Sequence, residues 1–213
     1  MDILHSRNLI ATFFCLGWVG EKYPELIKKI DVAGHEIGSH SYSHQLVHHQ
    51  SRELYRSDLQ RSLDVLQDIT GKKVVGYRAP GFSVTQECAW SFEIMKECGI
   101  EYDSSVFSAV RAHGGMPEIV VDGPFVIDTP SGALQEFPVL GFNFIGREFV
   151  FCGGGYFRLL PWQLIKFFFG IAKYNMAYFH PRDFDFSQPT LNLPLVRRFK
   201  SYVGLKGAEK KLI

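Results

Sequence analysis

Continuous apolar runs alternate, in the first half of the chain, with segments whose apolar residues recur every three or four positions. The continuous runs predict buried strands, and the three-to-four-residue repeat predicts amphipathic helices. The expected order is strand Leu9–Phe14, helix Pro24–Ile30, strand Glu36–His40, helix Ser51–Ile69, strand Val74–Arg78, helix Glu87–Cys98 and strand Ile100–Asp103. This alternation predicts an α/β fold, in which crossover helices join the strands of a parallel sheet.

The second half of the chain breaks the alternation. Residues 110–158 are rich in Gly, Pro and Phe, so we expect loops and short hairpins there, inserted on the rim of a barrel. Three more elements are predicted after them: helix Pro161–Tyr174, strand Met176–Phe179 and helix Leu193–Val203. Because no internal repeat and no linker is visible, residues 1–213 are predicted to form one domain.

The composition is typical of a globular protein. The 213 residues suffice for a sizeable core, and 46% of them are apolar and 21% charged. A formal net charge of +1 gives no reason to expect a nucleic-acid partner. The most apolar window, residues 159–178, contains two lysines and a proline, which favours a core helix and a strand over a membrane span.

The cysteines and the N-terminal residues bear on the compartment. No pair among the four cysteines has Cys-x-x-Cys spacing, so free thiols in a reducing compartment are favoured over a disulfide framework. The N-terminal residues lack a basic segment followed by an apolar one, which is the pattern of a signal peptide. The chain as given is therefore expected to be cytoplasmic.

Two histidines lie four positions apart, where a predicted strand ends. They are His40 and His44. Neutral imidazole is the commonest ligand of transition metals in proteins, and this spacing lets both rings face one ion if the backbone turns after His40. In a chain with eight histidines such a spacing also arises by chance. The pair therefore indicates a metal site only together with other residues.

Four predicted strands end in a polar residue capable of chemistry, namely His40, Arg78, Asp103 and His180. In a parallel α/β barrel the catalytic groups lie at the carboxyl ends of the strands, so this pattern favours an active site. Each residue also has an ordinary explanation. Arg78 could be a solvated strand end, Asp103 a turn cap, and His180 a buried histidine with its hydrogen bonds satisfied.

Several other polar or glycine-rich positions are expected to lack a functional role. The glycines at 153–155 are predicted to form a tight turn rather than a phosphate-binding loop. Surface positions are expected for His5, His48, His49 and His113, and Asp183 and Asp185 could be surface charges.

These motifs, taken in order, resemble the polysaccharide deacetylases of carbohydrate esterase family four, the nodulation-type deacetylases. His40-Ser-Tyr-Ser-His44 resembles the family's metal motif, and Arg78-Ala-Pro-Gly-Phe82 its groove motif. Tyr102-Asp-Ser-Ser105 and Tyr178-Phe-His-Pro181 resemble its later motifs. Further stretches, among them residues 153–161, resemble a branch linked to bacterial exopolysaccharide export.

The resemblance implies a fold and a reaction. The fold would be a deformed (β/α) TIM-like barrel, and the reaction metal-dependent removal of N-acetyl groups from amino sugars of a surface or extracellular polysaccharide. His40 and His44 would bind a divalent metal, usually zinc, and the backbone N–H of Gly81 would face the oxyanion. His180 would be the general acid, held in its charged form by Asp103 at about 2.6–3.2 Å.

The same resemblance implies roles for the groove residues. Arg78 would steady the general-base aspartate of the family, and Pro80, Phe82 and Tyr42 would bind the sugar. The expected partner is a polysaccharide or oligosaccharide, with no nucleic acid and no membrane span. The oligomeric state is left open.

One family motif is missing. The Asp-Asp pair that supplies the base and the third metal ligand belongs to a first strand, whereas Met1–Leu4 resembles the end of the helix after that strand. We therefore expect the first strand to be absent and the chain to be poorly active or inactive as a deacetylase. Two alternatives stay open: a hydrolase of another linear or cyclic amide, and a non-catalytic carbohydrate-binding relative.

Overall fold

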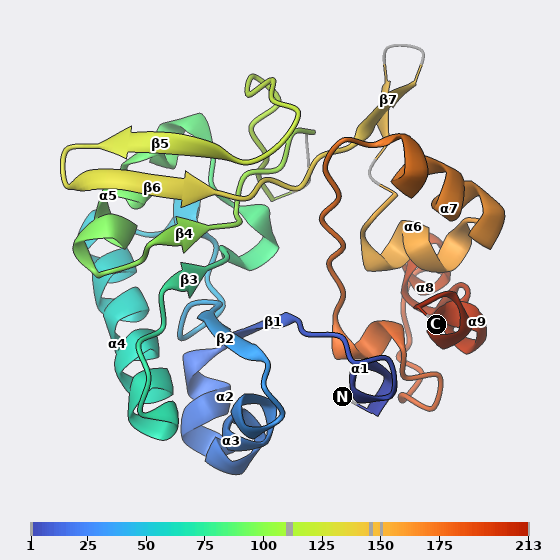
Figure 1. Ribbon diagram of the computed structural model, residues 1–213, viewed down its shortest axis with the longest axis horizontal. Coiled ribbons are helices and arrows are strands. Elements are labelled where there is room, and N and C mark those ends of the chain that lie inside the picture. Colours follow the sequence, from blue (N-terminus) through green and yellow to red (C-terminus); the bar gives the residue numbers. More distant parts are fainter. Residues whose placement is uncertain (1, 110–112, 145–146, 150, 213) are drawn as a thin grey trace. The chain divides into compact units, whose positions relative to one another are not determined.

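The computed structural model describes residues 2–109, 113–144, 147–149 and 151–212 (Figure 1). The chain divides into two compact units, residues 1–138 and residues 139–213. The expectation of a single domain stays a prediction.

A six-stranded sheet forms the centre of the first unit, with the strand order β1-β2-β3-β4-β6-β5. All neighbouring pairs are parallel except β5 with β6. The predicted parallel α/β arrangement is therefore confirmed. The strands are β1 (Thr12–Cys15), β2 (Glu36–Ser39), β3 (Gly76–Tyr77), β4 (Tyr102–Asp103), β5 (Phe125–Thr129) and β6 (Gly132–Glu136).

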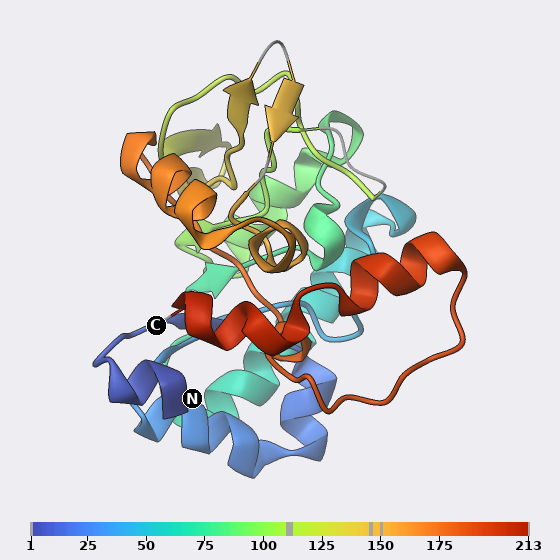
Figure 2. The ribbon, with the colours of Figure 1, turned by 90° about the vertical axis from the view of Figure 1, so that its right-hand side faces the viewer.

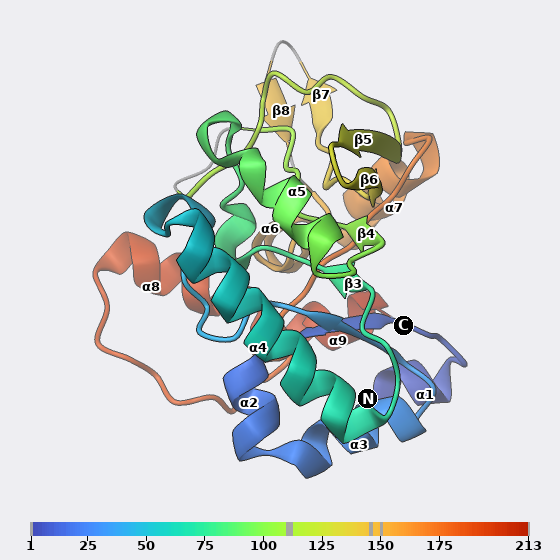
Figure 3. The same ribbon diagram turned by 90° about the vertical axis from the view of Figure 1, so that its left-hand side faces the viewer.

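Helices cover one face of this sheet. Figures 1 and 3 show α2, α3, α4 and α5 on the same face of the strands β1 to β4. Short 3-10 helices η1 (Val47–His49), η2 (Pro80–Phe82) and η3 (Gln86–Cys88) lie in the connections. The α-helices of the unit are α1 (Asp2–Ser6), α2 (Gly17–Lys22), α3 (Pro24–Val32), α4 (Arg52–Thr70) and α5 (Trp90–Glu97).

The predicted long helix is confirmed as α4. The Ser51 side chain accepts a hydrogen bond from the backbone N–H of Leu54 at its start, and Gly71 ends it with φ +66°. Its stripe of Leu59, Leu63 and Leu66 is buried against the sheet and α3. These apolar side chains supply the hydrophobic contact that fixes α4 on the sheet.

Helix α2 was not predicted, because its glycines resemble helix breakers. The structure gives Gly17 another role: a Cβ on it would lie 2.9 Å from Cα of Ser62 in α4. Gly17 and Gly20 thus let α2 pack directly against α4.

The predicted hairpins of residues 110–158 are confirmed in part. β5 and β6 form one hairpin, but β6 also pairs in parallel with β4, so this hairpin extends the main sheet instead of standing apart on a rim. In the second unit, β7 (Phe142–Phe144) and β8 (Arg147–Phe149) form an antiparallel pair. Residues 110–112 fall outside the described part of the chain.

The second unit is mainly helical (Figure 2). Its elements include α6 (Gly154–Leu159), α7 (Trp162–Ile171), η4 (Pro181–Asp183), α8 (Leu195–Tyr202) and α9 (Leu205–Leu212). α7 and α8 were predicted, whereas α6 and α9 were not. The predicted tight turn at residues 153–155 is wrong, because a helix begins at Gly154.

The predicted strand at residues 176–179 is also wrong. Among the described residues this segment pairs only through a single parallel bridge between Gly153 and Tyr178, which is too little pairing for a ladder. All four cysteines are free thiols, as expected. Within the described helices, none has the combined length and apolar character that a membrane crossing requires.

Candidate active site

The carboxyl edge of the sheet brings two of the predicted site residues into one row. Ser39 lies opposite Tyr77, and Tyr77 opposite Asp103, so the residues that follow them, His40, Arg78 and Ser104, are also in register. The backbone N–H of Arg78 donates to the Ser39 carbonyl at 3.0 Å, which continues the ladder beyond the strands. The predicted convergence of His40 and Arg78 is therefore present in the structure.

The imidazole of His40 is oriented by the backbone. Its Nδ1 lies 2.6 Å from the carbonyl oxygen of Arg78. A carbonyl can only accept, so Nδ1 carries the hydrogen and the lone pair of the neutral ring is on Nε2. Metal-binding histidines commonly donate their second nitrogen to a carbonyl in this way, which fixes the ring for coordination.

His44 lies beside this ring. The ring centroids of His40 and His44 are 5.1 Å apart, with an interplanar angle of 74°. The turn between them is strained, since Ser41 has φ +67° and His44 has φ +61°. Non-glycine residues in this region cost on the order of 1–3 kcal/mol each and persist only where the surroundings impose them.

Asp58 of α4 imposes this turn. Its carboxylate accepts the backbone N–H groups of Tyr42 at 2.7 Å and Ser43 at 3.0 Å, together with the Ser43 hydroxyl. The Ser41 hydroxyl accepts the backbone N–H of His44 at 3.0 Å. Sequence reasoning missed Asp58, because on a long polar helix it resembles any solvent-facing charge.

The two imidazoles suit a divalent metal as part of its ligand set, because the backbone has already fixed the tautomer of His40. A closed site needs further ligands, usually at least three from the protein. Among the described residues, no group of three or more His, Cys, Asp or Glu side chains is arranged to hold a metal ion. The pair therefore accounts for two ligands and leaves the remainder of the set unassigned.

Arg78 is held in place from two sides. Its Nε donates to the Ser104 carbonyl at 3.0 Å and Nη2 to the Ser104 hydroxyl at 2.6 Å. The guanidinium also lies 4.4 Å from the ring centroid of Phe14 and 5.4 Å from that of Phe82. These contacts keep a positive charge at the row of His40.

The Arg-Ala-Pro-Gly-Phe segment forms a tight turn after β3. Gly81 has φ +64°, a conformation that suits glycine, and the Ala79 N–H donates to the Ser105 hydroxyl at 2.7 Å. Pro80 and Phe82 are buried, and the Phe82 ring packs 5.2 Å from that of Phe107. Both support the turn that presents Gly81, and their contact with a sugar stays a prediction.

Asp103 belongs to the other face of the sheet. Successive strand residues point to opposite faces, and the row of Asp103 faces α4, as shown by the hydroxyl contact of Ser39 with Ser62 at 2.8 Å. Asp103 is fully buried and accepts the Ser105 hydroxyl at 2.6 Å. Through Ser105 it therefore supports the turn that contains Gly81.

A second buried acid, Glu136 of β6, lies directly opposite Asp103. Burial raises the pKa of Asp103 to about 6 despite hydrogen bonds that lower it. Burial, and then the charge of Asp103, raise the pKa of Glu136. Two such carboxyl groups are most stable when they hold a proton between them. Sequence reasoning missed Glu136, although it too ends a strand.

Tyr42 packs into the first unit. A Cβ on Gly17 would meet its ring at 2.6 Å, and the Arg61 guanidinium lies 3.8 Å from its ring centroid. Its hydroxyl donates to Glu21, and this bond raises the pKa of Tyr42. These contacts position the metal-motif turn, and the predicted role in sugar binding stays untested.

His180 precedes the short helix η4 of the second unit, and its side chain is 63% exposed. The reading of Asp183 as a surface charge does not hold, because its side chain is only 7% exposed and forms an ion pair with Arg158. The predicted contact between Asp103 and His180 joins the two units and stays a prediction.

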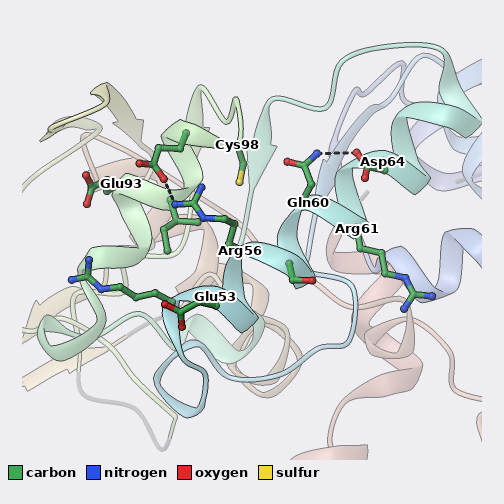
Figure 4. A pocket seen from close by; sticks show the side chains of 11 residues that line it. Glu53, Arg56, Gln60, Arg61, Asp64, Glu93 and Cys98 are labelled. Atoms are coloured by element: carbon green, nitrogen blue, oxygen red, sulfur yellow. Dashed lines mark hydrogen bonds and ion pairs between the residues drawn. The ribbon is translucent and has the colours of Figure 1, made fainter.

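A pocket of about 780 Å³ lies on α4 and α5, and none of the predicted site residues lines it (Figure 4). Charges of both signs surround it, including Arg56, Asp64, Glu93 and Glu97. Several of them already have partners, such as Arg56 with Glu97 and Asp64 with Gln60. The pocket therefore presents a solvated surface of paired charges.

Two family models match the chain in succession. Residues 1–102 match the model described as polysaccharide deacetylase, and residues 104–213 match one described as a domain of unknown function (DUF3473). The first half of the chain is therefore a polysaccharide deacetylase domain, and the second half belongs to the DUF3473 family. The division between the models falls at Asp103 of β4.

Named relatives agree with this assignment. The chain is 34% identical over 111 residues to the peptidoglycan deacetylase of Helicobacter pylori, covering 50% of this chain and 35% of that protein. It is 33% identical over 94 residues to the peptidoglycan-N-acetylglucosamine deacetylase of Bacillus cereus, covering 44% and 34%. The chain thus spans about a third of the length of these curated relatives.

A solved structure supports the fold. The crystal structure of a proposed polysaccharide deacetylase from Mycobacterium smegmatis is 28% identical, with a TM-score of 0.54, over 68% of this chain and 48% of that one. This likeness confirms the predicted fold class, the deformed TIM-like barrel of the deacetylases.

Proposed function

We propose that the chain carries part of the active site of a metal-dependent hydrolase that removes N-acetyl groups from amino sugars of a bacterial surface or extracellular polysaccharide. The observation that carries the proposal is the row of His40 and Arg78, in which the Arg78 carbonyl orients the His40 ring beside His44. The peptidoglycan deacetylases among the relatives support the substrate class.

His40 and His44 would hold the divalent ion, with zinc the first candidate because both ligands are imidazoles. When bound, the ion would supply Lewis-acid chemistry at the acetamide. Arg78 fixes the tautomer of His40 through its carbonyl, while its guanidinium keeps positive charge nearby through Ser104.

Hydrolysis breaks the C–N bond of the acetamide, and water supplies the hydroxyl group of the acetic acid formed and one hydrogen of the amine. His180 would give a proton to the leaving nitrogen as general acid. The backbone N–H of Gly81 would stabilise the negative oxygen formed when the carbonyl is attacked. Pro80, Phe82 and Tyr42 would shape the sugar-binding surface around this turn.

The proposal is tested by acetate release from an N-acetylglucosamine oligomer with zinc present. The wild-type rate of acetate release is the reference for the variants. His180→Ala should lower that rate by about 10²- to 10⁴-fold, the usual range for a general acid. His49→Ala removes an exposed imidazole outside the row and serves as the control.

Equal rates for the wild type and His180→Ala would contradict the proposal. Oligomer binding without acetate release would favour the non-catalytic carbohydrate-binding alternative. Release of ammonia or ring opening with a small cyclic amide, but no acetate from the oligomer, would favour the other amide hydrolase.

A further inference from the structure

The buried carboxylate of Asp183 lies next to His180. Asp183 follows it by three residues, and Oδ2 of Asp183 accepts the backbone N–H of His180 at 2.9 Å. The same oxygen lies 3.7 Å from Nδ1 of the ring, the separation of an ion pair rather than of a hydrogen bond. The ring is therefore anchored next to a carboxylate of its own turn.

The turn formed by η4 also contacts the His180 side chain. The His180 side chain accepts from the backbone N–H of Asp183, so the two residues cap each other across η4. Nδ1 is the ring nitrogen beside Asp183, at 3.7 Å from Oδ2. Nε2 then lies on the exposed side and is the nitrogen able to pass a proton outward.

Arg158 of α6 forms an ion pair with the carboxylate of Asp183. Its Nε lies 3.1 Å from Oδ1 of Asp183, and both side chains are buried. The guanidinium also donates to the carbonyls of Gly154, Lys200, Ser201 and Val203. Arg158 is thus held by α6 and by residues 200–203, independently of its contact with Asp183.

The charge state of Asp183 agrees with this geometry. Burial by itself would raise its pKa, but hydrogen bonds from His180 and the Arg158 charge outweigh burial, and the pKa of Asp183 is lowered. The positive groups facing it are Arg158 and, once protonated, His180. Arg182 lies next to it in the same turn.

The glycine at position 154 leaves space for the buried carboxylate of Asp183. A Cβ on Gly154 would lie 2.0 Å from Oδ2 of Asp183, so only glycine leaves room for the carboxylate. A Cβ on Gly155 would meet nothing within 4 Å. The two neighbouring glycines therefore offer a disruptive substitution and a matched control.

We infer that Asp183, locked by Arg158 and Gly154, is the positioning residue that orients the proton-donating imidazole of His180. The inference rests on the proposed function for the role of His180. It gives Asp183 the role that the family resemblance assigned to Asp103, whose carboxyl group is engaged by Ser105 and Glu136.

The first test follows both carboxyl groups by carbon-13 NMR titration in the wild type and in His180→Ala. The substitution alters only an exposed side chain, so the fold should persist. If Asp183 holds His180, its carboxyl group should titrate at higher pH in the variant, and Asp103 should be unmoved. An unmoved Asp183, or a larger displacement of Asp103, would overturn the inference.

The second test separates positioning from stability. Asp183→Asn and Gly154→Ala should each lower kcat for the oligomer by about 10- to 100-fold with KM nearly unchanged, whereas Gly155→Ala should match the wild type. Near-UV circular dichroism confirms that each variant is folded. Folded Asp183→Asn with a normal kcat would overturn the inference. If the wild type is no faster than His180→Ala, the proposed function fails, while the titration still decides whether Asp183 holds the ring.

Discussion

Two buried acids, Asp103 and Glu136, illustrate how single residues set the chemistry of this chain. Each lies at the end of a strand, yet the alternation of side chains turns both toward the helices and away from His40 and Arg78. Their environment keeps a proton between them. Asp103 supports the Gly81 turn through Ser105, and Glu136 accepts the backbone N–H of Val106 at 3.0 Å.

This pair predicts a stability that falls with rising pH. The pKa of Asp103 is raised from 3.8 to about 6, so the folded chain binds protons more tightly than the unfolded chain. The stabilisation is fully present below about pH 4 and is lost as the pH rises through about 6. Asp103→Asn removes this titrating carboxyl group and should abolish most of this loss, on the order of 1–3 kcal/mol.

Urea unfolding at pH 4, 5.5 and 7 measures the effect. Glu101→Gln, at an exposed position next to β4, is the control and should keep the wild-type pH dependence. A wild-type free energy of unfolding that does not decrease over this range more than that of Asp103→Asn would contradict the raised pKa of Asp103.

Elements position the site through close packing and local turns. α4 supplies Asp58 to the turn between His40 and His44, and α2 supplies Gly17, on which Tyr42 rests. The helix α4 was predictable from its apolar repeat and its glycine end. The turn was not, because its conformation depends on a carboxylate that is distant in sequence.

The packing of α2 on α4 predicts a difference between two glycines of one helix. Alanine at Gly17 would meet the Ser62 backbone at 2.9 Å, whereas alanine at Gly20 would meet only side-chain ends at 3.2–3.4 Å. Gly17→Ala should therefore destabilise the chain by about 1–3 kcal/mol. Gly20→Ala should cost less, since alanine also favours the helix. Chemical denaturation of both variants checks the order, and a reversed order would contradict this packing.

At the scale of the whole molecule, the sequence predicts the parallel sheet, the positions of its first four strands along the chain and the convergence of His40 with Arg78. These predictions follow from the spacing of apolar residues and from the polar residues that end the predicted strands, and both can be read from short stretches of sequence. Asp183 and Arg158 were missed because their importance arises from burial, which no local pattern of charges reveals. The strand predicted before His180 is absent from the described residues because a strand needs a neighbouring segment to pair with, and only one bridge, between Gly153 and Tyr178, forms there.

The central claim is that His40 and His44 form a metal site, and zinc binding measured by titration calorimetry tests it most directly. Two imidazoles without a third described ligand predict weak but measurable affinity. His44→Ala should lower that affinity by at least about tenfold, since even outer-shell changes cost 10- to 100-fold. His49→Ala, which removes a nearby exposed imidazole, should leave it unchanged. Equal zinc affinities for the wild type and His44→Ala would contradict the account.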